Sequence, residues 1–589
     1  MSRAAGIPVP SGRGGRQYTT STALLEALAE AGIRHLFANL GSDHTGIIEA
    51  LAQARSEGRE RDLPGLVVCP HETVALSAAH AYAAVARTPQ AVLVHVDSGT
   101  QNLGGAVNNA SRGRVPVLIF AGAAPYTIEG ELPGSRNEFI HWIQDVHDQR
   151  GILRNYVKYD NELRTGRNVK QVVQRSLQIA RSEPAGPVYL VGPREVMEEE
   201  LPRQAADPAW YTPVAPAALA EDVVAEVAGA LAGARHPLII TSYLGRDPAA
   251  VAALASLAGL LAIPVIESVP NHVNFPASHP LHCGYQWTTA SQNPLLAQAD
   301  VILSVDSDVP WIHTTSRPAA GAAIYCIDAD PLKSGMPMWH IPARRFAAAN
   351  SRLALGQLTG FLVGSGLVDE AAVAARRAEI GAVHDRQRAS WQAREEPSGD
   401  AITPAYLTAC VRELLRGEDA LVLTEAVTNF QVVAEHLRPD RPGSLIGSGG
   451  GSLGWAGGGA VGAKLAAPDR TVVCLVGDGS YLFGVPSAAQ WVARRYQAPA
   501  LTVILNNGGW QAPKKSLLAL HPHGAAAAAD DFHVSFDPVA DLAGIARAAG
   551  GAHGATVTEP GEVPHALKAA LAAVHGGQSA VLDVRVTAS

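Results

Sequence analysis

The chain has 589 residues, of which 47% are hydrophobic and 17% are charged. These values are typical of a folded protein with several cores, and they exclude a single small binding module or a disordered chain. The 54 acidic side chains outnumber the 46 basic ones, the net charge is −8, and no long run of Lys or Arg occurs. We therefore expect no nucleic-acid partner.

A first series of alternating helix and strand patterns spans residues 17–200. It follows a segment rich in Gly and Arg, residues 1–16, which we expect to be a disordered tail. Short apolar runs such as AVLVHV and VPVLIFAG are separated by stretches of helical periodicity. This alternation predicts parallel strands that are joined by helices.

The same alternation returns twice further along the chain. A second series spans residues 217–365 after a proline-rich linker, and a third spans residues 401–589 after a charged helical stretch. Strand-like runs include HPLIIT and DVILSV in the second series and TVVCLV and ALTVIL in the third. We predict an α/β protein of three domains, each a mostly parallel sheet flanked by helices.

Cysteine usage and hydropathy bear on the compartment. The five cysteines are scattered and never spaced as Cys-x-x-Cys, which is typical of a reducing environment. No signal-peptide pattern occurs, and no stretch reaches about 18 uninterrupted apolar residues. We expect a cytoplasmic protein without a membrane partner.

The third domain contains the most informative pair of motifs. A Gly477-Asp478-Gly479 turn ends one predicted strand, and Asn506-Asn507 ends the next strand of the same βαβ unit. Adjacent parallel strands place their carboxyl ends side by side, so a carboxylate and an amide meet beside glycines that admit close backbone approach. Such oxygen ligands suit Mg²⁺ and leave coordination positions for diphosphate oxygens.

This arrangement resembles the signature of the thiamine-diphosphate enzymes of the pyruvate decarboxylase and acetolactate synthase superfamily, and the likeness extends through all three domains. The resemblance implies that Asp478, the Asn507 side chain and the Gly509 carbonyl are the Mg²⁺ ligands. It also implies that the cofactor contacts the turn and the second motif, at Gly477, Asp478, Gly479, Ser480 and Asn507.

A dinucleotide-binding site is the rival interpretation of this region. Gly449-x-Gly451-x-x-Gly454 matches the Gly-x-Gly-x-x-Gly pattern and precedes a predicted helix. The strand before these glycines would be only SLIG, however, and the rival leaves Asn506 and Asn507 unexplained. It would make the protein a NAD-dependent dehydrogenase.

Thiamine chemistry requires a carboxyl group that stabilises the imino form of the aminopyrimidine ring. Glu72 follows a predicted strand and begins an Ala-rich helix, where the superfamily has its activating glutamate. An ordinary first-turn acid that complements the helix dipole is the alternative.

The glycine-rich segment before the next predicted helix matches two further positions of the superfamily. Leu453 matches the bulky residue under the bent cofactor, and the Gly451 carbonyl matches the acceptor for the cofactor's amino group. Tight helix packing is the alternative explanation for this segment.

Three positions resemble the active-site residues of benzoylformate decarboxylase. His95 stands where that enzyme has a catalytic histidine, Ser42 matches its substrate-carboxylate serine, and His313 matches its second histidine. Histidines that titrate near neutrality suit proton transfer after decarboxylation. Asp43 departs from the decarboxylase pattern, and so does the segment that follows Asn507.

These motifs together predict a thiamine-diphosphate- and Mg²⁺-dependent lyase that decarboxylates a 2-oxo acid without oxidation, and carboligase activity is compatible with the same chemistry. An acetolactate-synthase-like carboligase is the nearest alternative, and a non-catalytic homologue is another. The resemblance implies a homodimer or homotetramer, with Glu72 of one subunit meeting Asp478 of its neighbour at the interface.

Overall fold

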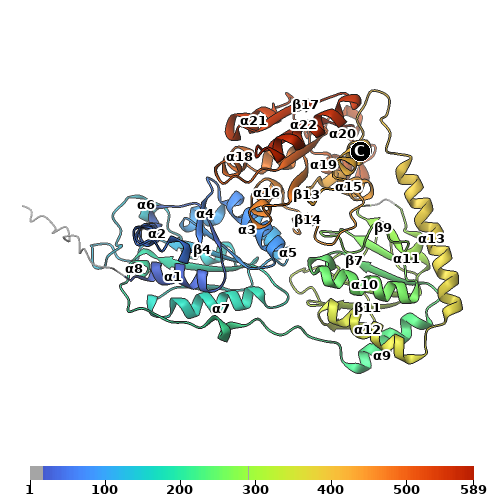
Figure 1. The fold of residues 1–589 in the computed structure, drawn as a ribbon, viewed down its shortest axis with the longest axis horizontal. Helices are drawn as coiled ribbons and strands as arrows, with labels where there is room; N and C mark the ends of the chain where they lie inside the picture. Colours follow the sequence, from blue (N-terminus) through green and yellow to red (C-terminus); the bar gives the residue numbers. More distant parts are fainter. Residues whose placement is uncertain (1–17, 289–290, 589) are drawn as a thin grey trace, which may run out of the picture.

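The computed structural model describes residues 18–288 and 291–588, and it contains three sheets of six strands, each flanked by helices (Figure 1). Every strand pairing within these sheets is parallel. The predicted α/β architecture of three domains is thereby confirmed. The predicted disordered tail, residues 1–16, lies outside the described residues.

The first sheet has the order β2-β1-β3-β4-β6-β5. Its interior strand β3 is apolar after the first residue and buried throughout, because helices cover both faces of a parallel sheet. The elements of this domain are α1 (Thr20–Glu30), β1 (His35–Ala38), α2 (Thr45–Ser56), β2 (Gly65–Val68), α3 (Glu72–Ala86), β3 (Gln90–Val94), α4 (Val96–Gln101), α5 (Gly104–Arg112), β4 (Val117–Ala123), α6 (Ile140–Ile143), β5 (Asp160–Glu162), α7 (Val169–Arg181), β6 (Val188–Pro193) and α8 (Arg194–Met197).

The central sheet has the order β12-β11-β10-β7-β8-β9, which is the doubly wound order of dinucleotide-binding domains. Its long helix α13 runs along the outer edge of the molecule and leads to the third domain (Figure 1). The elements are α9 (Glu221–Gly233), β7 (Pro237–Thr241), α10 (Pro248–Leu261), β8 (Val265–Ser268), β9 (His282–Gln286), α11 (Pro294–Gln298), β10 (Val301–Val305), β11 (Ala323–Asp328), β12 (Arg345–Ala348), α12 (Ser351–Ser365) and α13 (Glu370–Gln392).

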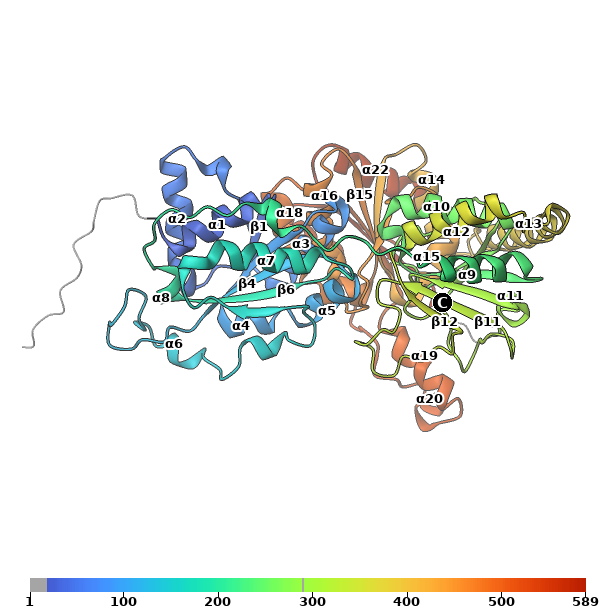
Figure 2. The ribbon, with the colours of Figure 1, turned by 90° about the horizontal axis from the view of Figure 1, so that it is seen from below.

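The third sheet, β14-β13-β15-β16-β18-β17, repeats the strand order of the first. Helices α19 and α20 project from the body of this domain (Figure 2). The elements are α14 (Pro404–Leu414), β13 (Ala420–Glu425), α15 (Phe430–Leu437), β14 (Leu445–Gly447), α16 (Trp455–Ala466), β15 (Thr471–Gly477), α17 (Asp478–Phe483), α18 (Pro486–Arg495), β16 (Leu501–Asn506), α19 (Gln511–Leu520), α20 (Ala525–Ala529), α21 (Leu542–Gly550), β17 (His553–Val557), α22 (Val563–His575) and β18 (Ala580–Arg585).

The first and third domains meet where α3 packs against α16, near the centre of the molecule (Figures 1 and 2). Glycines on α16 allow this contact. A Cβ atom at Gly458 would lie 2.7 Å from the Val74 carbonyl oxygen, and one at Gly462 would overlap the Ala78 carbonyl oxygen. The glycines of α16 therefore allow its close packing against α3.

The first and central domains are joined by Arg114, which forms a two-pronged ion pair with Asp308 at 2.6 and 3.0 Å. The guanidinium also lies 3.8 Å from the ring centre of Tyr243. Lys333 donates to the Tyr243 hydroxyl at 2.6 Å and lies 3.0 Å from Asp308. Since these groups are largely withdrawn from water, the junction is electrostatically matched and its ion pair is weakly screened.

No helix in the described ranges combines the length and the apolar character that a membrane crossing needs.

Candidate active site

The Gly477-Asp478-Gly479 turn and the Asn506-Asn507 pair lie side by side at one edge of the third sheet. Strands β15 and β16 are neighbours, and Gly477 pairs in register with Leu505. Chain order reverses around β13 and β15 in this sheet, since β14 lies on one side and β16 on the other. Ligands of parallel sheets bind at such a switch point.

The two asparagines of the pair have different tasks. Asn506 is held structurally: its amide donates to Asp583 at 2.7 Å, and its oxygen accepts the Gly508 N–H at 3.0 Å. The oxygen Oδ1 of Asn507 is buried and has no hydrogen-bond partner in the described part of the chain. Asn507 is therefore the member of the pair that is free to hold a ligand.

Asp478 offers a second buried oxygen without a partner. Its Oδ1 accepts the Gly479 N–H at 2.9 Å, whereas Oδ2 is buried and has no partner among the described residues. Burial raises the pKa of Asp478, although the N–H groups of Gly479, Gly509 and Gly508 oppose that shift. A buried carboxylate that faces only neutral donors lacks a compensating cation.

These oxygens fit the Mg²⁺ ligand set that the family resemblance implies. One carboxylate, one amide oxygen and one backbone carbonyl are hard donors of the kind that Mg²⁺ prefers. No group of three or more His, Cys, Asp or Glu side chains suited to a metal occurs in residues 18–288 and 291–588.

Glycines shape the backbone around this site. A Cβ atom at Gly479 would overlap the indole nitrogen of Trp510. Gly509 has a φ of 153°, and a Cβ atom there would overlap the Val534 carbonyl oxygen. Neither position tolerates a side chain, so both glycines are required for the turn geometry.

The glycine-rich loop before α16 is held by α5 of the first domain. Asn109 exchanges two hydrogen bonds with the backbone of Ser452, at 2.8 and 3.0 Å, and Asn108 donates to the Gly450 carbonyl at 3.0 Å. Gly451 is exposed, and a Cβ atom there would meet nothing within 4 Å. The position predicted to face the cofactor's amino group therefore borders open space, and half-buried Leu453 lies two residues further along the chain.

Glu425 was not predicted as a site residue, yet it fixes the far end of this loop. It ends β13, and its carboxylate accepts the N–H groups of Gly454 at 2.5 Å and Ala456 at 2.8 Å. Burial raises the pKa of Glu425 to about 8, although these N–H groups oppose the shift. Its carbonyl accepts the Ser480 hydroxyl at 3.0 Å, so one residue ties the Asp478 turn to the start of α16.

In the first domain, Glu72 is the first residue of α3 and is 6% exposed. Asn102 donates to its Oε2 at 3.0 Å, and its Oε1 lies 3.2 Å from the position that a Cβ atom of Gly99 would occupy. His95 borders Gly99 from another side, with its Cβ atom 3.5 Å from the same position. The structure thus brings Glu72 and His95 to the same glycine.

His95 follows β3, and Ser42 and Asp43 follow the neighbouring strand β1. The contact to the histidine comes from Asp43 rather than Ser42. Asp43 Oδ1 lies 2.5 Å from His95 Nδ1, and Gln144 Oε1 lies 2.7 Å from His95 Nε2. The departure from the decarboxylase pattern at residue 43 is thus the direct partner of the predicted catalytic histidine.

The charges of this cluster are coupled. Burial works against the charged form of His95, but the hydrogen bond and the negative charge of Asp43 outweigh it and raise the pKa of His95. Burial likewise opposes ionisation of Asp43, but His44 and His95 together lower its pKa. Burial lowers the pKa of His44, although the charge of Asp43 opposes that shift.

His313 is not brought to this cluster by the contacts within the chain. It lies in the central domain after β10, is exposed, and its Nε2 lies 3.0 Å from the His340 carbonyl oxygen. Its aromatic neighbours are Trp311 and His340. A shared site for His313 and His95 stays a prediction.

The rival dinucleotide interpretation fails on the strand order. β14, which precedes Gly449, is a three-residue strand at the edge of the third sheet rather than the central first strand of a dinucleotide-binding fold. The doubly wound order occurs in the central domain instead, where the glycine pattern is absent.

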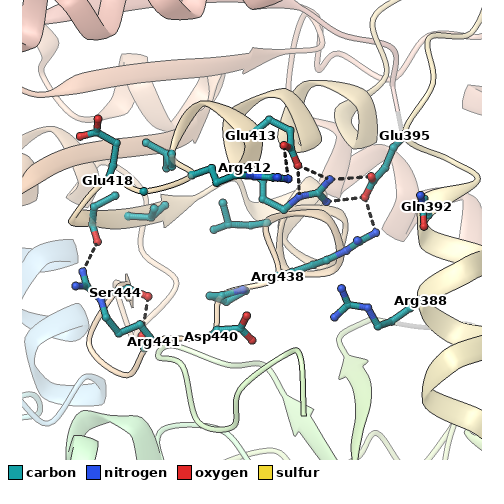
Figure 3. A pocket seen from close by; sticks show the side chains of 17 residues that line it. Arg388, Gln392, Glu395, Arg412, Glu413, Glu418, Arg438, Asp440, Arg441 and Ser444 are labelled. Carbon is teal, nitrogen blue, oxygen red and sulfur yellow. Dashed lines mark hydrogen bonds and ion pairs between the residues drawn. The ribbon is translucent and has the colours of Figure 1, made fainter. Parts of the chain in front are cut away.

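A cavity of about 680 Å³ between α13 and the third domain is lined by several arginines (Figure 3), and none of the predicted site residues lines it. Glu395 binds Arg412 at 2.7 Å and Arg438 at 2.6 Å, as the dashed lines show. These charges compensate one another, so the cavity presents little free positive charge.

Comparisons with known proteins agree with this geometry. Residues 18–152 match the family model of the thiamine pyrophosphate enzyme N-terminal TPP binding domain, residues 224–339 match the central domain, and residues 426–584 match the C-terminal TPP binding domain. Together they cover more than half of the chain.

Individual relatives carry different activities. The chain is 26% identical to a sulfoacetaldehyde acetyltransferase of Castellaniella defragrans, over 98% of this chain and 94% of that protein. It is 26% identical to a benzoylformate decarboxylase of Pseudomonas aeruginosa, over 84% and 87%. The fold is shared with a solved thiamine diphosphate-dependent 4-hydroxybenzoylformate decarboxylase of Rhodococcus jostii RHA1, with a TM-score of 0.76, 24% identity and coverage of 97% and 100%. The chain therefore belongs to the thiamine pyrophosphate enzymes, within the superfamily of decarboxylases and acetolactate synthases that its motifs indicated.

Proposed function

We propose that this protein is a thiamine-diphosphate- and Mg²⁺-dependent lyase that releases CO₂ from a 2-oxo acid without oxidation. The bound cofactor supplies the electron sink that this bond cleavage requires. The observation that carries the proposal is the cluster in the first domain, where His95 is in contact with Asp43 and borders the same glycine, Gly99, as Glu72 does. A proton donor beside the activating carboxylate suits a reaction that ends with protonation of the substrate carbon.

Asp478, Asn507 and the Gly509 carbonyl are proposed to hold Mg²⁺, which would neutralise negative charge of the diphosphate. The supporting observation is that the free side-chain oxygens of Asp478 and Asn507 are both buried without partners among the described residues. Gly477 and Gly479 would admit the diphosphate close to the backbone, and Ser480 would support the turn through its bond to Glu425.

Glu72 is proposed to hold a proton against the aminopyrimidine ring. Its carboxyl group is buried at the start of an Ala-rich helix, where water does not compete for it. The Gly451 carbonyl and Leu453 would position the same ring from the glycine-rich loop. Ser42, beside Asp43, is proposed to bind the substrate carboxylate.

The proposal places the complete site between two subunits. Within the described part of one chain, no hydrogen bond or ion pair joins Glu72 to Asp478. Large apolar side chains are exposed on both domains that would meet a partner, including Phe139 at 76% and Ile143 at 71% in the first domain and Leu520 at 78% in the third. Such patches mark interaction surfaces, and a two-fold dimer would cover both at once.

Incubation of the loaded enzyme with a panel of aliphatic, aromatic and acidic 2-oxo acids tests the reaction. We expect CO₂ and the matching aldehyde in equal amounts from at least one acid. His95→Ala should lower this turnover by roughly 10²-fold or more, whereas His565→Ala, on the exposed face of α22, should not.

Acetolactate-type carboligation is the second candidate, because the acetyltransferase relative matches nearly the whole chain. Formation of a C–C product from pyruvate or an acetylated product, with turnover that does not need His95, would replace the decarboxylase proposal by this one.

A further inference from the structure

We propose that Asp43 is a positioning residue that holds His95 with its Nδ1 hydrogen directed to a carboxylate and its Nε2 hydrogen available as the proton donor. This inference rests on the proposed function, because it assigns the group that prepares His95 for its reaction. The supporting geometry is a distance of 2.5 Å from Asp43 Oδ1 to His95 Nδ1 and one of 2.7 Å from Gln144 Oε1 to His95 Nε2.

Asp43 is itself fixed in place. Its side chain is 2% exposed, and its second oxygen accepts the Val96 N–H at 3.2 Å. A Cβ atom at Gly122 would overlap this carboxylate, so the side chain is enclosed on that face as well. A carboxylate held this rigidly fixes both the direction and the tautomer of the imidazole that it binds.

The groups around His95 come from several elements. Asp43 from the segment after β1 contacts the ring directly, while Asp97 on α4 acts on it only through space. His44 lies 3.3 Å from the other oxygen of Asp43, and its Nδ1 accepts the Gly41 N–H at 3.0 Å. Burial lowers the pKa of His44, whereas the hydrogen bond and the charge of Asp43 raise the pKa of His95.

Gln144 shows what the second nitrogen can bind. The amide oxygen at 2.7 Å from Nε2 is a neutral acceptor, of the kind that a carbonyl or carboxyl group of a 2-oxo acid also presents. In the reaction, the Nε2–H bond would break and a C–H bond would form at the carbon that has lost CO₂. The ring becomes neutral, Asp43 stays ionised, and water later returns the proton.

Replacement of the carboxylate by its neutral isostere tests this role. In Asp43→Asn, we expect the pKa of His95 to fall by about one to three pH units, because an opposite charge in contact is removed. The alkaline limb of the kcat profile should move to lower pH by the same amount, and kcat at pH 7.5 should drop at least about tenfold, with KM changed far less.

Asp97→Asn is the matched control. It removes one buried carboxylate from the same region, but Asp97 binds Gln101 rather than His95. We expect the titration of His95 to change by less than a third of the Asp43→Asn effect. In a His95→Gln background, Asp43→Asn should cause no further loss of kcat, because a residue that acts through His95 has nothing left to position.

Histidine-selective ¹⁵N NMR gives a readout that does not depend on turnover. In the unmodified protein, the His95 signal, assigned by its loss in His95→Gln, should show a protonated Nδ1 at pH 6–8. An unprotonated Nδ1, or an unchanged His95 titration in Asp43→Asn, would overturn the inference. If Asp43→Asn does not fold, the spectrum of the unmodified protein still decides. Normal turnover of His95→Gln would instead refute the proposed function, while the spectrum still tests the Asp43 contact.

Discussion

We predict that Asp478 destabilises the cofactor-free protein, and that this destabilisation is offset only when a cation binds. Its Oδ2 is a buried anionic oxygen without a partner among the described residues, and a buried unsatisfied group costs about 1–3 kcal/mol, or more when charged. Asp478→Asn removes the charge and keeps the shape. We therefore expect the apo variant to unfold with a free energy about 1–3 kcal/mol larger than that of the unmodified protein.

Asp583→Asn is the matched control in the same sheet. Asp583 is fully buried, but it accepts from Asn506 at 2.7 Å and pairs with Arg585 at 2.9 Å. Loss of these charged hydrogen bonds should destabilise the apo protein by about 1.5–3 kcal/mol. Two buried Asp→Asn changes in the same domain, one directly after β15 and one within β18, should thus have opposite signs.

Thermal unfolding with and without thiamine diphosphate and MgCl₂ measures both effects. For a domain of the size of the third domain, the melting temperature should shift by about 2–4 °C for each kcal/mol of stability. The ligands should stabilise the unmodified protein by about 2.7 kcal/mol at one hundred times Kd, and Asp478→Asn should lose this gain. Because burial raises the pKa of Asp478, the apo advantage of the variant should shrink as the pH falls and the carboxyl group takes up its proton. An apo variant that is less stable than the unmodified protein would refute the reasoning.

Three further changes test other parts of the structure. Gly462→Ala should destabilise the protein by about 1–3 kcal/mol in urea unfolding, because the added methyl group overlaps a backbone oxygen of α3. As the control, Gly381→Ala in α13 adds a methyl group that meets nothing within 4 Å, and it should stabilise the protein by about 0.5–1 kcal/mol. Arg114→Met should cost about 2 kcal/mol or more by leaving Asp308 without its two-pronged partner, and faster proteolysis between the first two domains would report it. Glu72→Gln should retain cofactor affinity in calorimetry yet lose at least about 10²-fold in turnover.

The interior strands of all three sheets could be predicted from the sequence, and most edge strands could not. Interior strands such as β3 and β16 are buried on both faces and appear as continuous apolar runs. The edge strands β5, β12 and β17 are short and largely half-exposed, so their sequences lack that pattern. The number of domains followed from the interior strands alone, which is why the architecture was correct.

Contacts within one βαβ unit of the candidate site could be predicted from the sequence, whereas contacts that depend on the order of strands in a sheet could not. Asp478 and Asn507 lie in one βαβ unit, so their proximity follows from chain connectivity. Asp43 and His95 are 52 positions apart, and they meet because β1 and β3 are neighbours in the sheet. Hydropathy gives the strands but not their order. The glycine pattern before α16 was misleading for the same reason. It matches the dinucleotide-binding motif in sequence, but that motif follows a central strand, whereas β14 lies at the edge of its sheet.

The repeated strand order of the first and third sheets gives the chain an internal two-fold likeness, with α3 and α16 as corresponding helices that pack on each other. The two corresponding helices begin differently. One begins with the carboxyl group of Glu72, and the other begins after an open glycine loop that Glu425 closes. A fragment that contains only one copy would keep a complete six-stranded sheet but would lose the α3–α16 contact, so each copy buries one of its helices against the other.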